Sequence, residues 1–244
     1  ASRTDGIRDI LTTGEKIIKI AEHIAPGEAA DYSQEPDGEA KKGSGLTILD
    51  AKGRTAIPGL VDAHVHFRDP GLTYKEDLQT GSAAAAAGGF TTVVCMANTK
   101  PVVDCPEVLD DILERAKELP VHVKQVSAVS KNFGGKELVD FEEMVRHGAC
   151  GFTDDGIPLT DAGFIRKAME MAAKVDMPIS LHEEDPSLNE VNGINKGVIS
   201  EQMGIGGAPA VSEDVMVARD VMLALESGAK VDIQHISSGR SVEL

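Results

Sequence analysis

Two histidines and an arginine stand close together in the segment PGLVDAHVHFRDPG, residues 58–71. His64 and His66 are separated by one residue in an apolar run, and Arg68 follows two residues later. Side chains two residues apart in a β-strand point to the same face of the sheet. The spacing therefore predicts that His64 and His66 form a chelating pair. A lone histidine is more often a satisfied core residue, but a pair joined by histidines at other strand ends favours metal ligands.

Further polar side chains stand at the ends of other predicted strands: Asn98, Asp154 with Asp155, His182 and His235. Four histidines and a carboxylate are more than one catalytic zinc takes, because such a zinc has three protein ligands and an open position. They suit two divalent metals bridged by a carboxylate and a hydroxide. Imidazole and carboxylate ligands without thiolates suit zinc, manganese, cobalt or iron. The chemistry indicated is metal-assisted hydrolysis of an amide-like bond.

Short apolar strands alternate with amphipathic helices after Gly59. We expect strands at 60–67, 91–97, 121–129, 150–155, 177–185 and 229–237. We expect helices at 74–89, 106–119, 136–148, 161–176 and 212–228, and a further one beginning at 238. Strict alternation implies a parallel sheet with helices outside it. In both architectures of this kind, the doubly wound sheet and the barrel, function lies at the carboxyl ends of the strands.

The first of these strands decides between the two architectures. It ends in His-Val-His-Phe-Arg, whereas a doubly wound sheet usually has a Gly-rich phosphate loop there. The predicted fold class is therefore α/β, a metal-dependent (β/α)8 TIM barrel of which about six β/α units are present. Because six units are fewer than eight, we expect a chain truncated at the C-terminus. The sequence does not begin with Met, so we expect a truncation at the N-terminus as well.

A small β-rich piece, a partial β-sandwich, is predicted over residues 1–58, and the partial barrel with the metal site over 59–244. The piece is expected to hold a hairpin at 7–24, an exposed loop at 28–45, and a strand and turn within 46–59.

The composition indicates which classes of partner and which cellular compartment are favoured for this protein. A formal net charge of −16 argues against nucleic acid as the main partner, because phosphate contacts need basic patches. No apolar run approaches the roughly 20 residues of a membrane span. The three cysteines show no CxxC spacing, so a disulfide framework is not expected and a reducing cytoplasm is favoured.

The remaining histidines, cysteines and acidic residues are less strongly indicated as metal ligands. We interpret His23, His122 and His147 as structural, and the two strand cysteines, Cys95 and Cys150, as core residues. Three acidic residues follow His182: Glu183, Glu184 and Asp185. They could support the metal ligands, but we interpret them as a solvated strand end.

The motifs together resemble the cyclic amidohydrolases, and bacterial class I dihydroorotases in particular. They are HVHFRDPG, CMANTKP, GFTDDG, SLHEED and DIQHISS, and the resemblance spans essentially the whole chain. It implies a metal-dependent barrel that interconverts N-carbamoyl-L-aspartate and L-dihydroorotate in pyrimidine biosynthesis. Hydantoinases and other dihydroorotases carry a carboxylated lysine at the fourth strand. The segment FTDDG has no lysine, which favours the class I branch over a hydantoinase or an allantoinase.

The resemblance also implies roles for individual residues. His64 and His66 would bind the more buried of two divalent metals, with zinc the first candidate. His182 and His235 would bind the second metal, and Asp155 rather than Asp154 would bridge the two. Arg68 and Asn98 would hold the substrate carboxylate, a role that suits the guanidinium fork. The family's proton-shuttling aspartate is expected beyond Leu244, so a chain ending there is expected to be hydrolytically inactive. Six strands leave two apolar edges of the barrel unpaired, so the same chain is also expected to be prone to aggregate.

Two other readings of the function stay open. One is a related cyclic amidase that acts on hydantoin-like rings. The other is a non-catalytic homologue that serves as a structural partner of a transcarbamoylase. Such a homologue would be expected to lose metal ligands, and the five ligand residues in this chain are intact. A small-molecule substrate is the expected partner, with a homodimer or an assembly with a transcarbamoylase as further possibilities.

Overall fold

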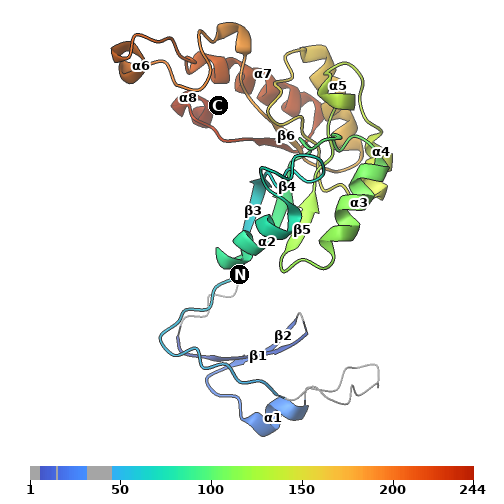
Figure 1. Ribbon diagram of the computed structural model, residues 1–244, viewed down its shortest axis with the longest axis vertical. Coiled ribbons are helices and arrows are strands. Elements are labelled where there is room, and N and C mark those ends of the chain that lie inside the picture. Colours follow the sequence, from blue (N-terminus) through green and yellow to red (C-terminus); the bar gives the residue numbers. More distant parts are fainter. Residues whose placement is uncertain (1–5, 15, 32–45) are drawn as a thin grey trace. The chain divides into compact units, whose positions relative to one another are not determined.

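The computed structural model describes residues 6–14, 16–31 and 46–244 (Figure 1). By its own contacts the chain divides into two units, Ala1–Ile57 and Pro58–Leu244, and each is described by itself. No helix within the described residues is long and apolar enough to cross a membrane.

The first unit contains an antiparallel pair of strands, β1 (Asp9–Thr13) and β2 (Lys16–Ala21), inside the predicted hairpin. A short helix, α1 (Pro26–Asp31), overlaps the start of the predicted loop, whose residues 32–45 lie outside the described residues. The strand predicted within 46–59 is not formed, because this segment pairs with neither strand of the unit's sheet. The predicted turn is present, with Arg54 N donating to Ala51 O at 3.0 Å.

The second unit is α/β, and its strands are parallel. One sheet has the order β3 (Leu60–Val65), β4 (Phe90–Cys95), β5 (His122–Gln125), and another pairs β6 (Ile179–Leu181) with β7 (Val231–Ile233). Phe152 joins them, because it forms a parallel bridge to Ser127 on one side and to Ile179 on the other. The six extended segments therefore follow one another in sequence order. A doubly wound sheet would reverse that order part-way across.

The helices of this unit flank the strands (Figure 1). They are α2 (Leu78–Ala87), α3 (Pro106–Ala116), α4 (Phe141–Arg146), α5 (Ala162–Lys174), α6 (Val198–Gln202), α7 (Val211–Ser227) and α8 (Gly239–Glu243), with short 3-10 turns η1 (Lys131–Phe133) and η2 (Pro186–Leu188). Aspartates begin three of them, since Asp77, Asp140 and Asp161 accept hydrogen bonds from the backbone N–H three residues later. Gly228, with φ +70°, ends α7 in the left-handed conformation.

Several predicted elements are shorter than expected, among them β5, β6 and β7. For two others, hydrogen bonding explains the difference. The strand at 150–155 is reduced to the Phe152 bridge, because the carboxylate of Asp154, not a backbone carbonyl, accepts from Val129 N and Ser130 N. The helix at 136–148 begins only at Phe141. Residues before it are held in an extended loop, with Val139 N donating to Val129 O at 3.1 Å.

The core lies between the strands and the helices. Phe141 of α4 and Phe152 are both fully buried, and their rings stack with centroids 3.9 Å apart. This close packing between helices and strands holds the strands in place. The side chains at the carboxyl ends of the strands are therefore held at one edge of the sheet.

Candidate metal centre

His64 and His66 converge at the end of β3. His64 lies within the strand and His66 directly follows it, so both side chains lie on one face, as the spacing predicts. Their Nε2 atoms are 3.1 Å apart, and each side chain is about a third exposed or less, at 27% and 32%. Two imidazole nitrogens therefore point at one place that solutes can reach.

Asp155 lies against both histidines. Its Oδ1 is 3.5 Å from His64 Nε2, and its Oδ2 is 3.6 Å from His66 Nε2. The side chain is only 5% exposed. Its two oxygens thus face the two rings separately, and one of them is also 3.9 Å from His182 Nδ1.

His182 and His235 form a second pair at the ends of β6 and β7. His182 Nδ1 lies 3.0 Å from His235 Nε2. Two groups able to hold a metal ion result, and both contain Asp155: His64, His66 and Asp155, and Asp155, His182 and His235. Within each group the ligand atoms lie within 4.8 Å of one another. The structure therefore brings the five predicted ligands together around one shared carboxylate.

The pKa shifts of most of these side chains favour the protonation states that bind a divalent cation. Burial lowers the pKa of His66 and of His235, which favours the neutral imidazole that a metal requires. Burial acts to raise the pKa of Asp155, but its hydrogen bond to His64 and the nearby histidines outweigh this, and the net pKa is lowered. The hydrogen bond that His64 donates to Asp155 raises the pKa of His64, which favours its charged form until a metal displaces the proton. A charged carboxylate among imidazoles is a donor set that fits a divalent metal ion.

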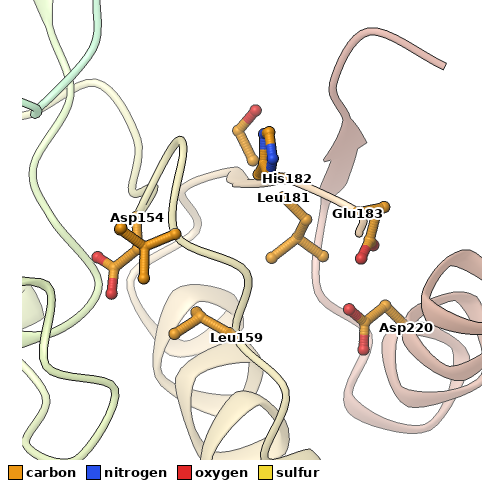
Figure 2. A pocket seen from close by; sticks show the side chains of 8 residues that line it. Asp154, Leu159, Leu181, His182, Glu183 and Asp220 are labelled. Atoms are coloured by element: carbon orange, nitrogen blue, oxygen red, sulfur yellow. The ribbon is translucent and has the colours of Figure 1, made fainter. Parts of the chain in front are cut away.

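Asp154, the neighbour of Asp155, points elsewhere. Its Oδ1 accepts from Val129 N at 2.7 Å and from Ser130 N at 3.1 Å, and its Oδ2 accepts from the Ser130 hydroxyl. Burial raises the pKa of this carboxyl to about 6. In Figure 2 the carboxyl group is directed away from His182. Its contacts are those of a residue that holds a loop.

Asn98 and Arg68 lie at the same edge. Asn98 Oδ1 is 3.1 Å from His66 Nδ1, and Asn98 Nδ2 donates to Asp155 Oδ2 at 2.8 Å. With the amide in this orientation, His66 carries its proton on Nδ1 and leaves Nε2 free as a ligand. Arg68 Nη1 donates to the backbone O of Asn98 at 3.3 Å.

The interpretation of the acidic residues after His182 as a solvated strand end is wrong for Glu183, which is buried, and Glu184, although partly exposed, contacts a predicted ligand. Glu184 Oε2 lies 3.4 Å from His182 Nε2, so it can fix the ring that faces the centre with Nδ1. The available signal was its position two residues after a ligand, on the same face of the strand. Glu183 is 6% exposed, and burial, then the neighbouring Asp220, raises its pKa to about 8. Figure 2 shows the Glu183 and Asp220 carboxyl groups pointing toward one another beside a small pocket.

The other histidines and the cysteines lie outside the two ligand groups. His147 Nδ1 is 2.9 Å from Asp110, and His23 Nδ1 is 3.1 Å from Asp9. His122 is the exposed first residue of β5. Cys95 and Cys150 are free thiols that pack with the core, and burial raises the pKa of Cys95 to about 12.

A parallel α/β edge that gathers four histidines around one aspartate defines a candidate binuclear metal site, and comparison with known proteins gives the family. Residues 53–241 match the family described as Dihydro-orotase-like. A dihydroorotase of Clostridioides difficile (strain 630) is 56% identical over 243 residues, which are 100% of this chain and 54% of that protein. One of Streptococcus thermophilus (strain CNRZ 1066) is 47% identical with the same coverage. The chain belongs to the Dihydro-orotase-like family, and it spans about half the length of the curated relatives it matches.

Solved structures show a similar fold at low identity. The L-hydantoinase (dihydropyrimidinase) from Arthrobacter aurescens superposes with a TM-score of 0.68 at 22% identity, over 97% of this chain and 51% of that one. A dihydroorotase in complex with 5-fluoroorotic acid from Saccharomyces cerevisiae gives 0.51 at 17% identity, over 76% of this chain and 50% of that one. These likenesses concern the fold alone.

Proposed function

We propose that the full-length protein is a dihydroorotase, which interconverts L-dihydroorotate and N-carbamoyl-L-aspartate in de novo pyrimidine biosynthesis. The observation that carries the proposal is the position of Asp155, which lies within 4 Å of nitrogens from both histidine pairs. Relatives at 43–56% identity bear the same name.

Two divalent metal ions, zinc first among the candidates, would be held by this chain. His64, His66 and Asp155 form the first set of ligands, and Asp155, His182 and His235 the second. Two metals sharing a carboxylate polarise a carbonyl and supply hydroxide near neutral pH. Asp155 keeps its charge through its contacts with the histidines, and Asn98 holds both Asp155 and His66 in place.

Arg68 and Asn98 are proposed to bind the carboxylate that dihydroorotate carries outside its amide bond. Ring opening adds one water across the C–N bond. The oxygen goes to the carbonyl carbon, which becomes a carboxylate, the nitrogen takes one proton to become the carbamoyl NH2, and the second proton of the water is released. Arg68 would hold the far side of the ring through two parallel N–H···O bonds, so that the carbonyl faces the histidines.

The proposal also covers the complete fold of the protein, its compartment and its assembly. A (β/α)8 barrel, of which this chain supplies six units, is supported by the parallel strands in sequence order and by the fold likeness. A reducing cytoplasm agrees with three free cysteines. A homodimer or an assembly with a transcarbamoylase stays a prediction.

The second candidate is a hydantoinase-like cyclic amidase, the related activity that the metal-ligand motif alone would also allow. Against it stand the absence of a lysine in FTDDG and the arginine beside the site, Arg68. The test is the ratio of kcat/KM for L-dihydroorotate to that for hydantoin and allantoin, measured on the metal-loaded full-length protein. We expect dihydroorotate to lead by at least about 100-fold, the discrimination that one charge-assisted pair provides. A preference for hydantoin would overturn the assignment, and no turnover of any ring would favour the non-catalytic homologue.

A further inference from the structure

We propose that Arg115 of α3 is a positioning residue for Arg68 and acts through Asp69. The inference rests on the proposed function of Arg68 as the carboxylate-binding residue. Arg115 contacts none of the predicted metal ligands, and its partner is the residue that directly follows Arg68.

The contact between the two is a bidentate ion pair. Arg115 Nη1 donates to Asp69 Oδ1 at 2.8 Å and to Oδ2 at 2.9 Å, and the Asp69 side chain is only 12% exposed. Asp69 Oδ2 also accepts from Leu78 N at 3.3 Å, at the start of α2. One carboxylate therefore ties the loop after β3 to two helices.

The guanidinium of Arg115 is itself held on its helix. Its Nε and Nη2 atoms donate to Asp111 Oδ2 at 3.0 and 2.8 Å, one turn earlier in α3. Because Asp111 holds the Nε and Nη2 side of the guanidinium, the remaining nitrogen, Nη1, is presented to both oxygens of Asp69 in a fixed position, which an exposed single ion pair would not do.

The loop that Asp69 anchors is under strain and packs tightly. Arg68 has φ +60°, a left-handed conformation that costs free energy in a residue with a Cβ and persists only when the surroundings enforce it. Lys100 N donates to Pro70 O at 3.0 Å. A Cβ on Gly71 would lie 1.8 Å from Lys100 O, so the loop after β3 touches the loop after β4 directly.

These contacts make one platform from the two loops that carry Arg68 and Asn98. Arg68 reaches back to the Asn98 carbonyl, and the backbones join at Pro70 and Lys100. The ion pair between Arg115 and Asp69 attaches this platform to α3. Without this ion pair, Arg68 can relax to an ordinary φ, and its guanidinium then leaves the position that faces the carboxylate.

Steady-state kinetics of the full-length protein test the idea. For Arg115→Ala and Asp69→Asn we expect KM for L-dihydroorotate to rise by about 10- to 100-fold, since misplacement of a positioning group by about 1 Å costs that much. We expect kcat within twofold of wild type, and unchanged metal content. Arg115→Lys, which keeps the charge without the fork, should fall between. Lys117→Ala, which removes the neighbouring cation paired with Glu114, is the matched control and should leave KM unchanged.

Combination with Arg68→Ala separates positioning from a general structural role. If Arg115 acts through Arg68, Arg115→Ala should add less than twofold to KM in the Arg68→Ala background. Full additivity, or a fall in kcat at constant KM, would overturn the proposal.

A crystal structure of Arg115→Ala supplies a readout that does not depend on activity. We expect Arg68 to leave its positive φ and residues 68–71 to shift. An unchanged loop would overturn the positioning role even if the enzyme is a dihydroorotase. An inactive wild type with a shifted loop would count against the proposed function alone.

Discussion

Asp154 and Asp155 are neighbours in the chain and have opposite surroundings. Asp155 faces three imidazoles, whereas Asp154 accepts hydrogen bonds from two backbone N–H groups and a hydroxyl. Alternation along an extended segment puts consecutive side chains on opposite faces, which explains the difference. The sequence could predict that one of the two faces the histidines. The family resemblance favoured Asp155, but the strand pattern by itself could not show which one, because that depends on the register between residues 150–155 and the neighbouring segments.

Alanine substitutions at the two positions should separate metal binding from loop structure. Asp155→Ala should lose at least one of two metals, because it removes the shared ligand. Asp154→Ala should keep both metals and lower the free energy of unfolding by about 1–3 kcal/mol for each buried N–H left without an acceptor. Elemental analysis and urea unfolding of the full-length variants check both outcomes. Loss of metal in Asp154→Ala with retention in Asp155→Ala would reverse the assignment.

Arg68 is the residue on which substrate preference is expected to depend. Arg68→Ala should cost roughly 2–5 kcal/mol in kcat/KM for dihydroorotate, the range for loss of a charge-assisted pair. Arg68→Lys keeps the charge but loses the two parallel hydrogen bonds, so an intermediate loss is expected. Metal content should survive both changes. An Arg68→Ala enzyme with unchanged kcat/KM would remove Arg68 from the substrate site.

At the scale of the elements, the start of α7 supports the second histidine pair. Asp185 N donates to Ser212 O at 2.9 Å, and the Ser212 hydroxyl donates to Asp185 O. Glu213 accepts from Ser237 N at 2.8 Å and from Ser238 N at 2.9 Å. The segments after His182 and His235 are thus both attached to the same turn of helix. The helix itself could be predicted from its periodicity, but these attachments join residues 24–27 positions apart and have no local pattern.

Substitution of Glu213 tests this support. Glu213→Gln keeps the size of the side chain but replaces one acceptor oxygen by a donor, so one of the two N–H groups loses its partner. We expect one metal to bind about tenfold more weakly, as supporting residues around metal ligands typically show, and the other to bind as in wild type. Metal titration with a chelator measures the two affinities. An equal loss at both sites would indicate a general loss of stability instead.

At the scale of the whole molecule, residues 58–244 depend on Phe152 for continuity. The segment 150–153 lies between the sheet of β3, β4 and β5 and the pair β6 and β7, and Phe152 forms a parallel bridge to each side. Cys150 N and Thr153 N add backbone hydrogen bonds to Gln125 O and Ser127 O. The alternation of strands and helices made the α/β class and the strand order predictable. The reduction of the fourth strand to one residue was not, because a side chain, that of Asp154, takes the place of a backbone partner.

Truncation of Phe152 should therefore affect stability and the metal centre together. Phe152→Ala removes a fully buried ring stacked on Phe141, and we expect a loss of about 3–5 kcal/mol in the free energy of unfolding. Phe152→Leu should cost less. Denaturant unfolding of the full-length protein measures both. A loss below about 1 kcal/mol for the alanine variant would show that the two sheets are held together by other contacts.

The central claim, a pair of metals around Asp155, is tested most directly by an anomalous-scattering map of metal-loaded crystals of the full-length protein, measured at the metal's absorption edge. The predicted result is two peaks about 3.5–4 Å apart. One should lie between His64 and His66, the other between His182 and His235, with one oxygen of Asp155 directed at each or a single oxygen between them. A single peak, or peaks that do not touch Asp155, would contradict the account.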